Sequence, residues 1–324
     1  MSSCFESSVV SEKTRSPEYL RKLQSLSLED KILYSKVKIQ EYYVYYKGKV
    51  YVSFSGGRDS TVLMDLVRNM YPEVPAVFFD TGLEFPEIRE HVKTFDDVEW
   101  IKPKTSFRKV IETRGYPCIG KECAHYISLA QRGFPSGLKQ MQLETRYGFK
   151  KYSYLVDAPF AISGDCCDMM KKRPAHEYLK KTGRFPIIGT RAEESELRVS
   201  KWLVKGDNNY SDNSTSNPLS IWLEKDIKEY IRLNKLPISR VYDMGYDRTG
   251  CVFCMFGIMQ NPDRFLILKK THLQLWEYCM KPWDEGGLGM REVLDFMKIP
   301  TGYEQTNLLE FSAIKNTVGG ADSQ

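Results

Sequence analysis

The stretch that decides the fold runs Lys49-Val50-Tyr51-Val52-Ser53-Phe54, followed by Ser55-Gly56-Gly57-Arg58-Asp59-Ser60. Its first half is β-branched and aromatic, which predicts a short buried strand. Residues 59–70 carry apolar side chains at helical spacing, which predicts a helix. Two glycines between a strand and a helix allow a sharp turn and a close approach to a ligand. The sequence therefore predicts a strand, a tight loop and a helix in direct succession.

The predicted loop has the properties of a phosphate site. The N-terminus of the following helix presents unpaired N–H groups and the positive end of the helix dipole. Ser55, Ser60 and Thr61 add hydroxyl donors, and Arg58 adds a fixed positive charge. The pattern is neither the Gly-x-x-x-x-Gly-Lys-Ser/Thr loop of other nucleotide hydrolases nor Gly-x-Gly-x-x-Gly. On these residues alone, an ordinary strand-to-helix turn remains the alternative.

Further strands and helices alternate along the chain. Residues 76–79, 98–101 and 185–189 form short apolar runs that predict strands, and residues 85–94 and 107–113 have the pattern of helices. Strands that alternate with helices indicate an α/β fold, with a parallel twisted sheet and helices on both faces. The strands are apolar throughout, as expected where both sheet faces are covered. The last third of the chain is predicted to be mainly helical.

Length and composition are those of a globular protein. The chain has 324 residues, of which 42% are hydrophobic and 27% charged. No run of 18 apolar residues predicts a membrane span, and no secretory signal pattern opens the sequence, so we expect a cytoplasmic protein with reduced thiols. The net charge of +5 suits anionic ligands, but no dense Lys/Arg run demands a nucleic acid.

Four segments are expected from the pattern. They are an N-terminal helical extension over 1–45, a nucleotide-binding domain with the cysteine site over 46–260, a helical region over 261–312 and a disordered tail over 313–324.

Two cysteine pairs predict a metal site. Cys251-x-x-Cys254 is a common chelating pair, because a short turn brings both sulfurs to one point. The side chains of the adjacent Cys166 and Cys167 diverge, which suits a cluster with separate irons better than a single ion. Four thiolates are the ligand set of a [4Fe–4S] cluster. Zinc on the same thiolates stays open, as does a thiol–disulfide pair at Cys251 and Cys254.

The other cysteines show no such pattern. We interpret Cys118 and Cys123 as structural thiols, with a redox or sulfur-relay role as the minor alternative. Cys4 and Cys279 have no evident partner in the sequence.

From about Val50 to Phe256 the order of motifs resembles the phosphoadenosine phosphosulfate (PAPS) reductase family, a branch of the PP-loop ATP pyrophosphatase superfamily. The motifs are the loop at 55–60, the segment Phe79-Asp80-Thr81-Gly82-Leu83-Glu84, the segment Gly189-Thr190-Arg191 through Arg198, and the cysteine pairs. The resemblance implies an adenine nucleotide α-hydrolase-like fold. It also implies a nucleotide site at Ser55, Gly56, Gly57, Arg58, Asp59, Ser60, Thr61, Asp80, Gly82, Gly189, Arg191 and Arg198.

The resemblance further implies a [4Fe–4S] cluster on Cys166, Cys167, Cys251 and Cys254, with the basic residue Lys171 beside it. Arg191 and Arg198 would share one face if their segment is helical, and two forked cations suit phosphate or sulfate. The alternative for that segment is a solvated helix face with Glu–Arg pairs.

Two departures from the family pattern shape the functional hypothesis. Arg58 stands where the family usually has lysine. The planar, rigid guanidinium of arginine thus replaces the mobile ammonium group of lysine. The segment from Tyr303 to Gln324 lacks the family's Glu-Cys-Gly-Leu/Ile-His motif, whose cysteine attacks sulfur in the reductases. Reduction by the usual mechanism needs such a thiolate on a mobile element.

The sequence therefore favours an enzyme that binds ATP or adenosine phosphosulfate and activates an acceptor by adenylylation for sulfur transfer. Arg58 and Asp59 are its candidate catalytic residues, with Mg²⁺ expected beside the departing pyrophosphate. The expected partners are an adenine nucleotide and a sulfur donor such as a cysteine desulfurase; the acceptor could be a nucleic acid, a metabolite or a protein. The alternatives are a sulfonucleotide reductase with a thiol reductant, and a nucleotide-sensing or scaffold subunit without turnover.

Overall fold

The computed structural model describes residues 15–143 and 148–303. The chain forms two compact units. The first, here the sheet unit, comprises Met1–Val110 and Cys166–Val252, and the second, here the helical unit, comprises Ile111–Asp165 and Phe253–Gln324. The predicted disordered tail at 313–324 lies outside the described residues.

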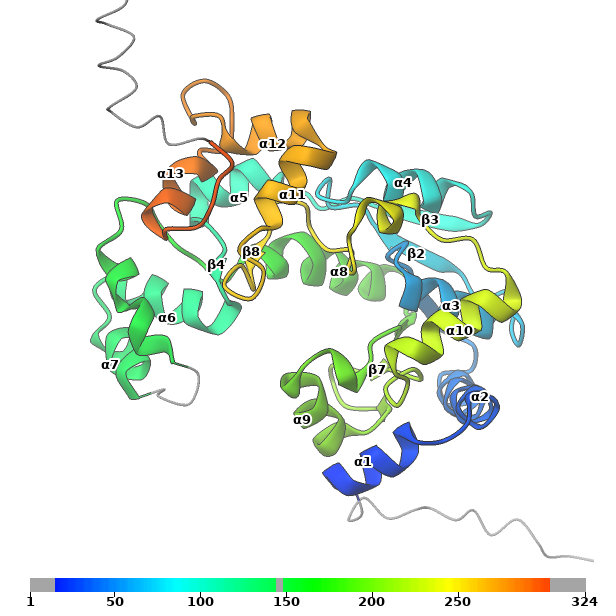
Figure 1. The fold of residues 1–324 in the computed structure, drawn as a ribbon. Helices are drawn as coiled ribbons and strands as arrows, with labels where there is room; N and C mark the ends of the chain where they lie inside the picture. The colour runs from blue at the N-terminus through cyan, green and yellow to red at the C-terminus, as the bar shows by residue number, and fades with distance from the viewer. Residues whose placement is uncertain (1–14, 144–147, 304–324) are drawn as a thin grey trace, which may run out of the picture. The chain divides into compact units, whose positions relative to one another are not determined.

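A six-stranded sheet forms the centre of the sheet unit (Figure 1). Its strands, in spatial order, are β3 (Val98–Ile101), β2 (Ala76–Phe79), β1 (Val50–Ser53), β5 (Phe185–Ile188), β7 (Thr215–Ser216) and β6 (Asn208–Asn209). The first five run parallel, and β6 pairs antiparallel with β7. The predicted α/β fold and the four strands that the sequence predicted are confirmed.

The two short strands were not predicted. β6 lies within residues 205–214, whose polar composition indicates a loop, and β7 follows that loop directly. Side chains as well as backbone hold the two strands together, since Ser216 Oγ donates to Asn208 Oδ1 at 2.6 Å.

Helices cover both faces of the sheet. Tyr178 of α8 (Arg173–Thr182) packs against Tyr51 and Val77 on one face. On the other face, Phe54 packs edge-on against Phe95, which follows α4 (Pro86–Lys93). This alternation follows from the strand geometry, in which successive side chains point to opposite faces.

The order of strands reverses at β1. From β1 the chain runs through α3 (Arg58–Arg68) to β2 on one side, whereas β5 lies on the other side of β1. In open α/β sheets, ligands bind beyond the carboxyl ends of the strands at such a switch point. The carboxyl end of β1 carries the predicted phosphate loop.

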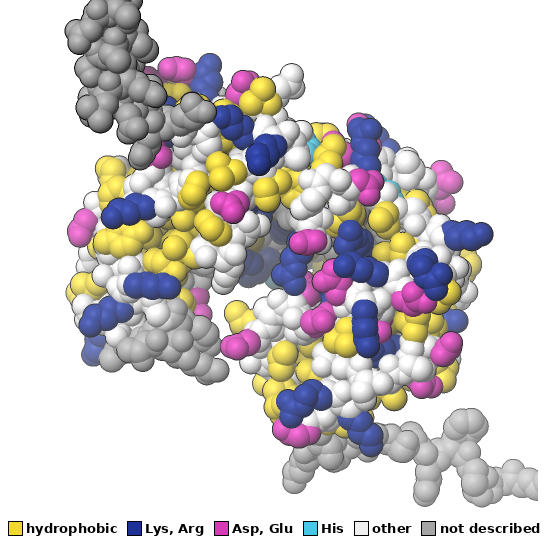
Figure 2. Space-filling view, in the orientation of Figure 1, with side chains coloured by type: hydrophobic (Ala, Val, Ile, Leu, Met, Phe, Trp, Pro, Cys, Tyr) yellow, Lys and Arg dark blue, Asp and Glu magenta, His cyan; other side chains and the backbone are white. Residues whose placement is uncertain are grey.

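The remaining elements of the sheet unit surround this core. They are α1 (Pro17–Gln24), α2 (Leu28–Tyr45), the π-helix η4 (Asp168–Lys172), the 3-10 turns η5 (Ala192–Glu194) and η6 (Arg240–Met244), α9 (Glu196–Lys205) and α10 (Glu224–Asn234). Figure 2 shows Lys/Arg and Asp/Glu side chains interspersed over the surface that carries α10. Pairs such as Lys228–Glu224 at 2.8 Å account for that pattern.

The helical unit contains α6 (Lys121–Gln131), α7 (Pro135–Leu143), the 3-10 helix η3 (Phe149–Asp157), α11 (Arg264–Thr271), α12 (Leu273–Met280) and α13 (Met290–Phe296). Its two-stranded sheet pairs β4 (Cys118–Ile119) in parallel with β8 (Met255–Phe256). α5 (Phe107–Arg114) joins the two units along the chain. Through the described ranges, none of the helices has the length and apolarity that a membrane crossing requires.

Candidate functional site: the phosphate loop and its pocket

Hydroxyl groups fix the shape of the loop at the carboxyl end of β1. Ser60 Oγ and Thr61 Oγ1 both donate to the carbonyl of Gly57, at 2.9 and 3.0 Å. Ser60 Oγ also accepts a hydrogen bond from the amide of Ser55 at 3.1 Å. Ser60 and Thr61, which the sequence predicts as donors to phosphate, thus donate their hydroxyl protons to the turn itself in this structure.

Close packing explains why glycine stands at two positions of the site. Gly56 has φ +71°, and a Cβ there would lie 2.8 Å from Val92 Cγ2 and 2.9 Å from Ile88 Cγ2. A Cβ on Gly189, after β5, would lie 2.9 Å from the carbonyl oxygen of Asp59. Both backbones therefore approach their neighbours more closely than any side chain would allow.

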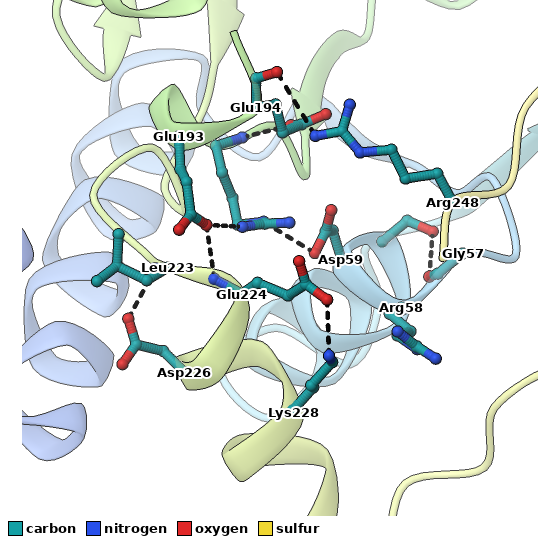
Figure 3. A network of polar contacts seen from close by, with 12 residues as sticks. Gly57, Arg58, Asp59, Glu193, Glu194, Leu223, Glu224, Asp226, Lys228 and Arg248 are labelled. Atoms are coloured by element: carbon teal, nitrogen blue, oxygen red, sulfur yellow. Dashed lines mark hydrogen bonds and ion pairs between the residues drawn. The ribbon is translucent and has the colours of Figure 1, made fainter. Parts of the chain in front are cut away.

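A buried arginine ties the loop to the end of β5 (Figure 3). Arg191 Nε lies 3.1 Å from Asp59 Oδ1, and its guanidinium also pairs with Glu193. Glu193 in turn accepts from the backbone amide of Glu224, at the start of α10, at 2.7 Å. Burial raises the pKa of Asp59, while Arg191 acts to lower it. With two carboxylates around a side chain that is 7% exposed, Arg191 holds the first turn of α3 in place.

Arg191 and Arg198 would share one helix face only if their segment were a continuous helix, and that condition is not met. Ser195 adopts an extended conformation between η5 and α9 and caps α9 through its side chain. Arg198 lies in α9, half-exposed, and pairs with Glu194 at 3.3 Å. The Glu–Arg pairing considered as the alternative for this segment is therefore present.

Asp80 and Gly82 shape the turn that follows β2. Asp80 is buried and its Oδ2 pairs with Arg89 at 2.9 Å. Its Oδ1 accepts from the amide of Gly82 at 3.1 Å, and Gly82 has φ +74°. The carboxylate of Asp80 is thus engaged on both oxygens, whereas Gly82 is exposed.

A pocket of about 570 Å³ opens beside the loop. All of its lining residues belong to the sheet unit. They include Ser55 of the loop, Thr249 and Gly250, side chains along β1 and β5, one face of α8, and the segment 212–215. The pocket therefore joins the phosphate loop to the surface of the sheet that α8 covers.

Two lysines and a histidine line this pocket. Lys172 at the end of η4, and His176 and Lys180 of α8, are four residues apart, so they share one helix face, and all three are exposed. No hydrogen bond or ion pair joins the side chains of Lys172 and Lys180 to another residue within the described parts of the chain. Elsewhere on the same stretch the charges are paired, as in Lys104–Glu177 at 2.8 Å. Unpaired cations in a concave site favour an anionic ligand. The four-residue spacing was the available signal, and sequence reasoning missed it.

The predicted cluster ligands are divided between the units. Cys166, Cys167 and Cys251 lie in the sheet unit, and Cys254 lies in the helical unit. Lys171 lies beside Cys251, with Glu84 and Cys167 near, and these groups raise the pKa of the Lys171 ammonium. Burial raises the pKa of Cys251, and Lys171 opposes that shift.

The positive charge of Lys171 beside Cys251 is of the sign that a metal-bound thiolate needs. In residues 15–143 and 148–303, no group of three or more His, Cys, Asp or Glu side chains is assembled so as to hold a metal ion.

Three further thiols lie buried in the helical unit. Burial raises the pKa of Cys123 and of Cys279 to about 12, and it raises that of Cys118 as well. Such thiols stay protonated and unreactive at neutral pH. Cys4 lies outside the described residues.

The family model of the phosphoadenosine phosphosulfate reductase domain matches residues 49–109 and 100–256. The chain belongs to that family. It is 30% identical over 261 residues to an uncharacterized protein of Methanocaldococcus jannaschii, covering 79% of this chain and 53% of that protein. The chain thus spans about half the length of that relative.

Other relatives of the family are reductases. The adenosine 5'-phosphosulfate reductase of Lysinibacillus sphaericus is 24% identical over 212 residues, covering 65% of this chain and 76% of that protein. The crystal structure of phosphoadenylyl-sulfate reductase from Candida auris, in a phosphate complex, aligns with 73% of this chain and 95% of that chain, at 19% identity and a TM-score of 0.41.

Proposed function

We propose that this chain is a nucleotide-dependent enzyme of sulfur metabolism that binds ATP or a related adenylate and activates an acceptor by adenylylation. The observation that carries the proposal is the loop at 55–61, which opens through Ser55 onto a pocket lined by the exposed ammonium groups of Lys172 and Lys180. The N-terminus of α3 supports anion binding through its dipole and its backbone amides. AMP is a far better leaving group than hydroxide, so the adenylate prepares the acceptor for attack by sulfur.

The residues of the loop have separate roles in this proposal. The backbone at 56–58 and Ser55 bind the departing pyrophosphate, whereas the Asp59–Arg191 pair positions the first turn of α3. Mg²⁺ would supply further neutralisation of the phosphate charge when bound.

The experiment is a pyrophosphate-release assay with ATP and Mg²⁺. We expect release by the wild type and a fall of about tenfold in Asp59→Asn, because the substitution removes a charge-assisted contact with Arg191. Asp65→Asn is the matched control: Asp65 lies in the same helix but accepts from Tyr230 at 2.6 Å, away from the loop. If Asp59→Asn releases pyrophosphate as fast as the wild type does, Asp59 has no role in the proposed reaction.

Sulfonucleotide reduction is the second candidate, favoured by the family and by relatives named as reductases. Cys279 does not suit the role of its attacking thiolate, because this thiol is fully buried and burial raises its pKa to about 12. Thiol-dependent release of sulfite from adenosine phosphosulfate would reverse the preference.

One contact favours a sensing role without turnover. The Arg58 guanidinium stacks on the Tyr242 ring, 3.8 Å from the ring centre. This contact fixes the loop cation in place, where the family usually has a mobile lysine charge. Tight ATP binding with no release of pyrophosphate would support that role.

The proposed cofactor is a [4Fe–4S] cluster on Cys166, Cys167, Cys251 and Cys254, with zinc as the alternative. We expect anaerobically purified protein to be brown and to contain iron, and alanine at Cys166 or Cys254 to remove the metal. Cys279→Ala is the control, since this buried thiol donates to the Trp276 carbonyl and its loss should leave the metal content unchanged. Colourless protein with zinc and no iron, by elemental analysis, would exclude the cluster.

A further inference from the structure

The phosphate loop already has a partner for one of its amides. The backbone N–H of Arg58, the first residue of α3, donates to the hydroxyl of Tyr242 at 3.0 Å. The first amides of a helix have no partner within the helix, and these are the groups that bind anions. A neutral side chain from η6 thus occupies one position that a phosphate oxygen would take.

The hydroxyl of Thr249 lies beside that of Tyr242 and fills the space next to the Gly57 backbone. Thr249 Oγ1 lies 3.4 Å from the Tyr242 hydroxyl. A Cβ on Gly57 would lie 2.8 Å from Thr249 Oγ1 and 3.3 Å from the Tyr242 hydroxyl. The two hydroxyls therefore rest directly on the Gly57 backbone, where a bound phosphate would need room.

The segment 242–249, which carries both hydroxyls, contains no buried residue, whereas Val241 just before it is fully buried and anchors the start of η6. Arg240 pairs with Glu90 at 2.8 Å, but both side chains are more than half exposed. Exposed pairs of this kind contribute at most about 1 kcal/mol. Gly245, with φ +89° and open space around it, ends η6. These features allow the segment to move away without disturbing the core.

We propose that Tyr242 competes with the nucleotide for the phosphate loop. Its hydroxyl holds the Arg58 amide until a phosphate oxygen displaces it and the segment 242–249 withdraws. A charged phosphate oxygen forms a stronger hydrogen bond with the amide than a phenol does, so the exchange favours the nucleotide. This inference rests on the proposed nucleotide site and adds its regulation.

Tyr242→Phe tests the competition, because phenylalanine keeps the ring beneath Arg58 and removes only the hydroxyl. We expect ATP to bind between about twofold and tenfold more tightly, the range that corresponds to one neutral hydrogen bond. Adenosine, which has no phosphate, should bind the wild type and the variant equally. Tyr246→Phe is the matched control, since its ring packs on Phe85 at 4.5 Å in the same segment.

Hydrogen exchange of the wild type gives a second readout that needs no variant. The amides of residues 242–249 should exchange faster when ATP is bound, because the segment has withdrawn. Slower exchange, or ATP binding to Tyr242→Phe that equals or falls below that of the wild type, would overturn the inference while leaving the nucleotide site intact. Absence of ATP binding in both proteins would instead overturn the site and the inference with it.

Discussion

Gly56→Val is expected to lower the affinity for ATP by more than about a hundredfold. The backbone of Gly56 has φ +71°, a conformation that costs a β-branched residue about 1–3 kcal/mol. Its Cβ would also lie within 3 Å of methyl groups of Val92 and Ile88, and overpacking of this kind adds about 1–3 kcal/mol. The loop can relieve the backbone strain and the overpacking only by moving away from Ile88 and Val92 of α4. That movement would destroy the geometry of the proposed phosphate site. Calorimetric titration with ATP measures the affinity, and urea unfolding should show a loss of about 2–4 kcal/mol.

Gly183→Ala separates backbone strain from the loss of the loop. Gly183 ends α8 with φ +67°, and a Cβ there would meet nothing within 4 Å. We expect Gly183→Ala to lower stability by about 1 kcal/mol and to leave the affinity for ATP unchanged. If Gly56→Val binds ATP as tightly as Gly183→Ala does, the loop is not the phosphate site.

The sequence predicted those parts of the fold that local patterns encode. β1 and β5 were predicted to within one or two residues, because β-branched and apolar runs mark buried strands wherever they occur. The loop was predicted because two glycines between a strand and a helix allow a sharp turn and a close approach to a ligand. The polar strands β6 and β7 were missed, since β7 is a strand through its pairing with β5 and β6 through its pairing with β7, and polar composition does not indicate either pairing.

The missing parts of the site have the same explanation. Tyr242 meets Arg58 across 184 positions of sequence, so no local pattern links them. Arg191 was predicted to bind phosphate from its type, whereas its burial between Asp59 and Glu193 depends on the fold. The sequence therefore predicted the backbone of the loop well, but it did not predict the contacts that side chains make beside the loop.

Asp226→Ala is expected to destabilise the protein by about 3–5 kcal/mol, because it leaves a buried charge without a partner. Lys31 of α2 and Asp226 of α10 form an ion pair at 2.6 Å, with the Lys31 side chain fully buried and that of Asp226 8% exposed. Asp226 also accepts from the amide of Leu223 at 2.7 Å and so caps α10. Lys38→Met, on the same helix, removes a partly exposed pair with Glu41 and a cation that lies 5.5 Å from the centre of the Tyr34 ring, and it should cost about 1 kcal/mol.

The double variant Lys31→Met with Asp226→Asn distinguishes a stabilising pair from an unpaired charge. Asparagine keeps an oxygen for the Leu223 amide, and methionine fills the space of the lysine stem without its charge. We expect urea unfolding to recover most of the stability lost in Asp226→Ala, since apolar replacements of buried pairs are often neutral. The backbone amide of Glu224, two residues before Asp226, donates to Glu193, which pairs with Arg191 beside the loop. If Asp226→Ala lowers the affinity for ATP through this contact, the double variant should restore that affinity. A double variant as unstable as Asp226→Ala would mean that the pair itself, and not the unpaired charge, holds α2 to α10.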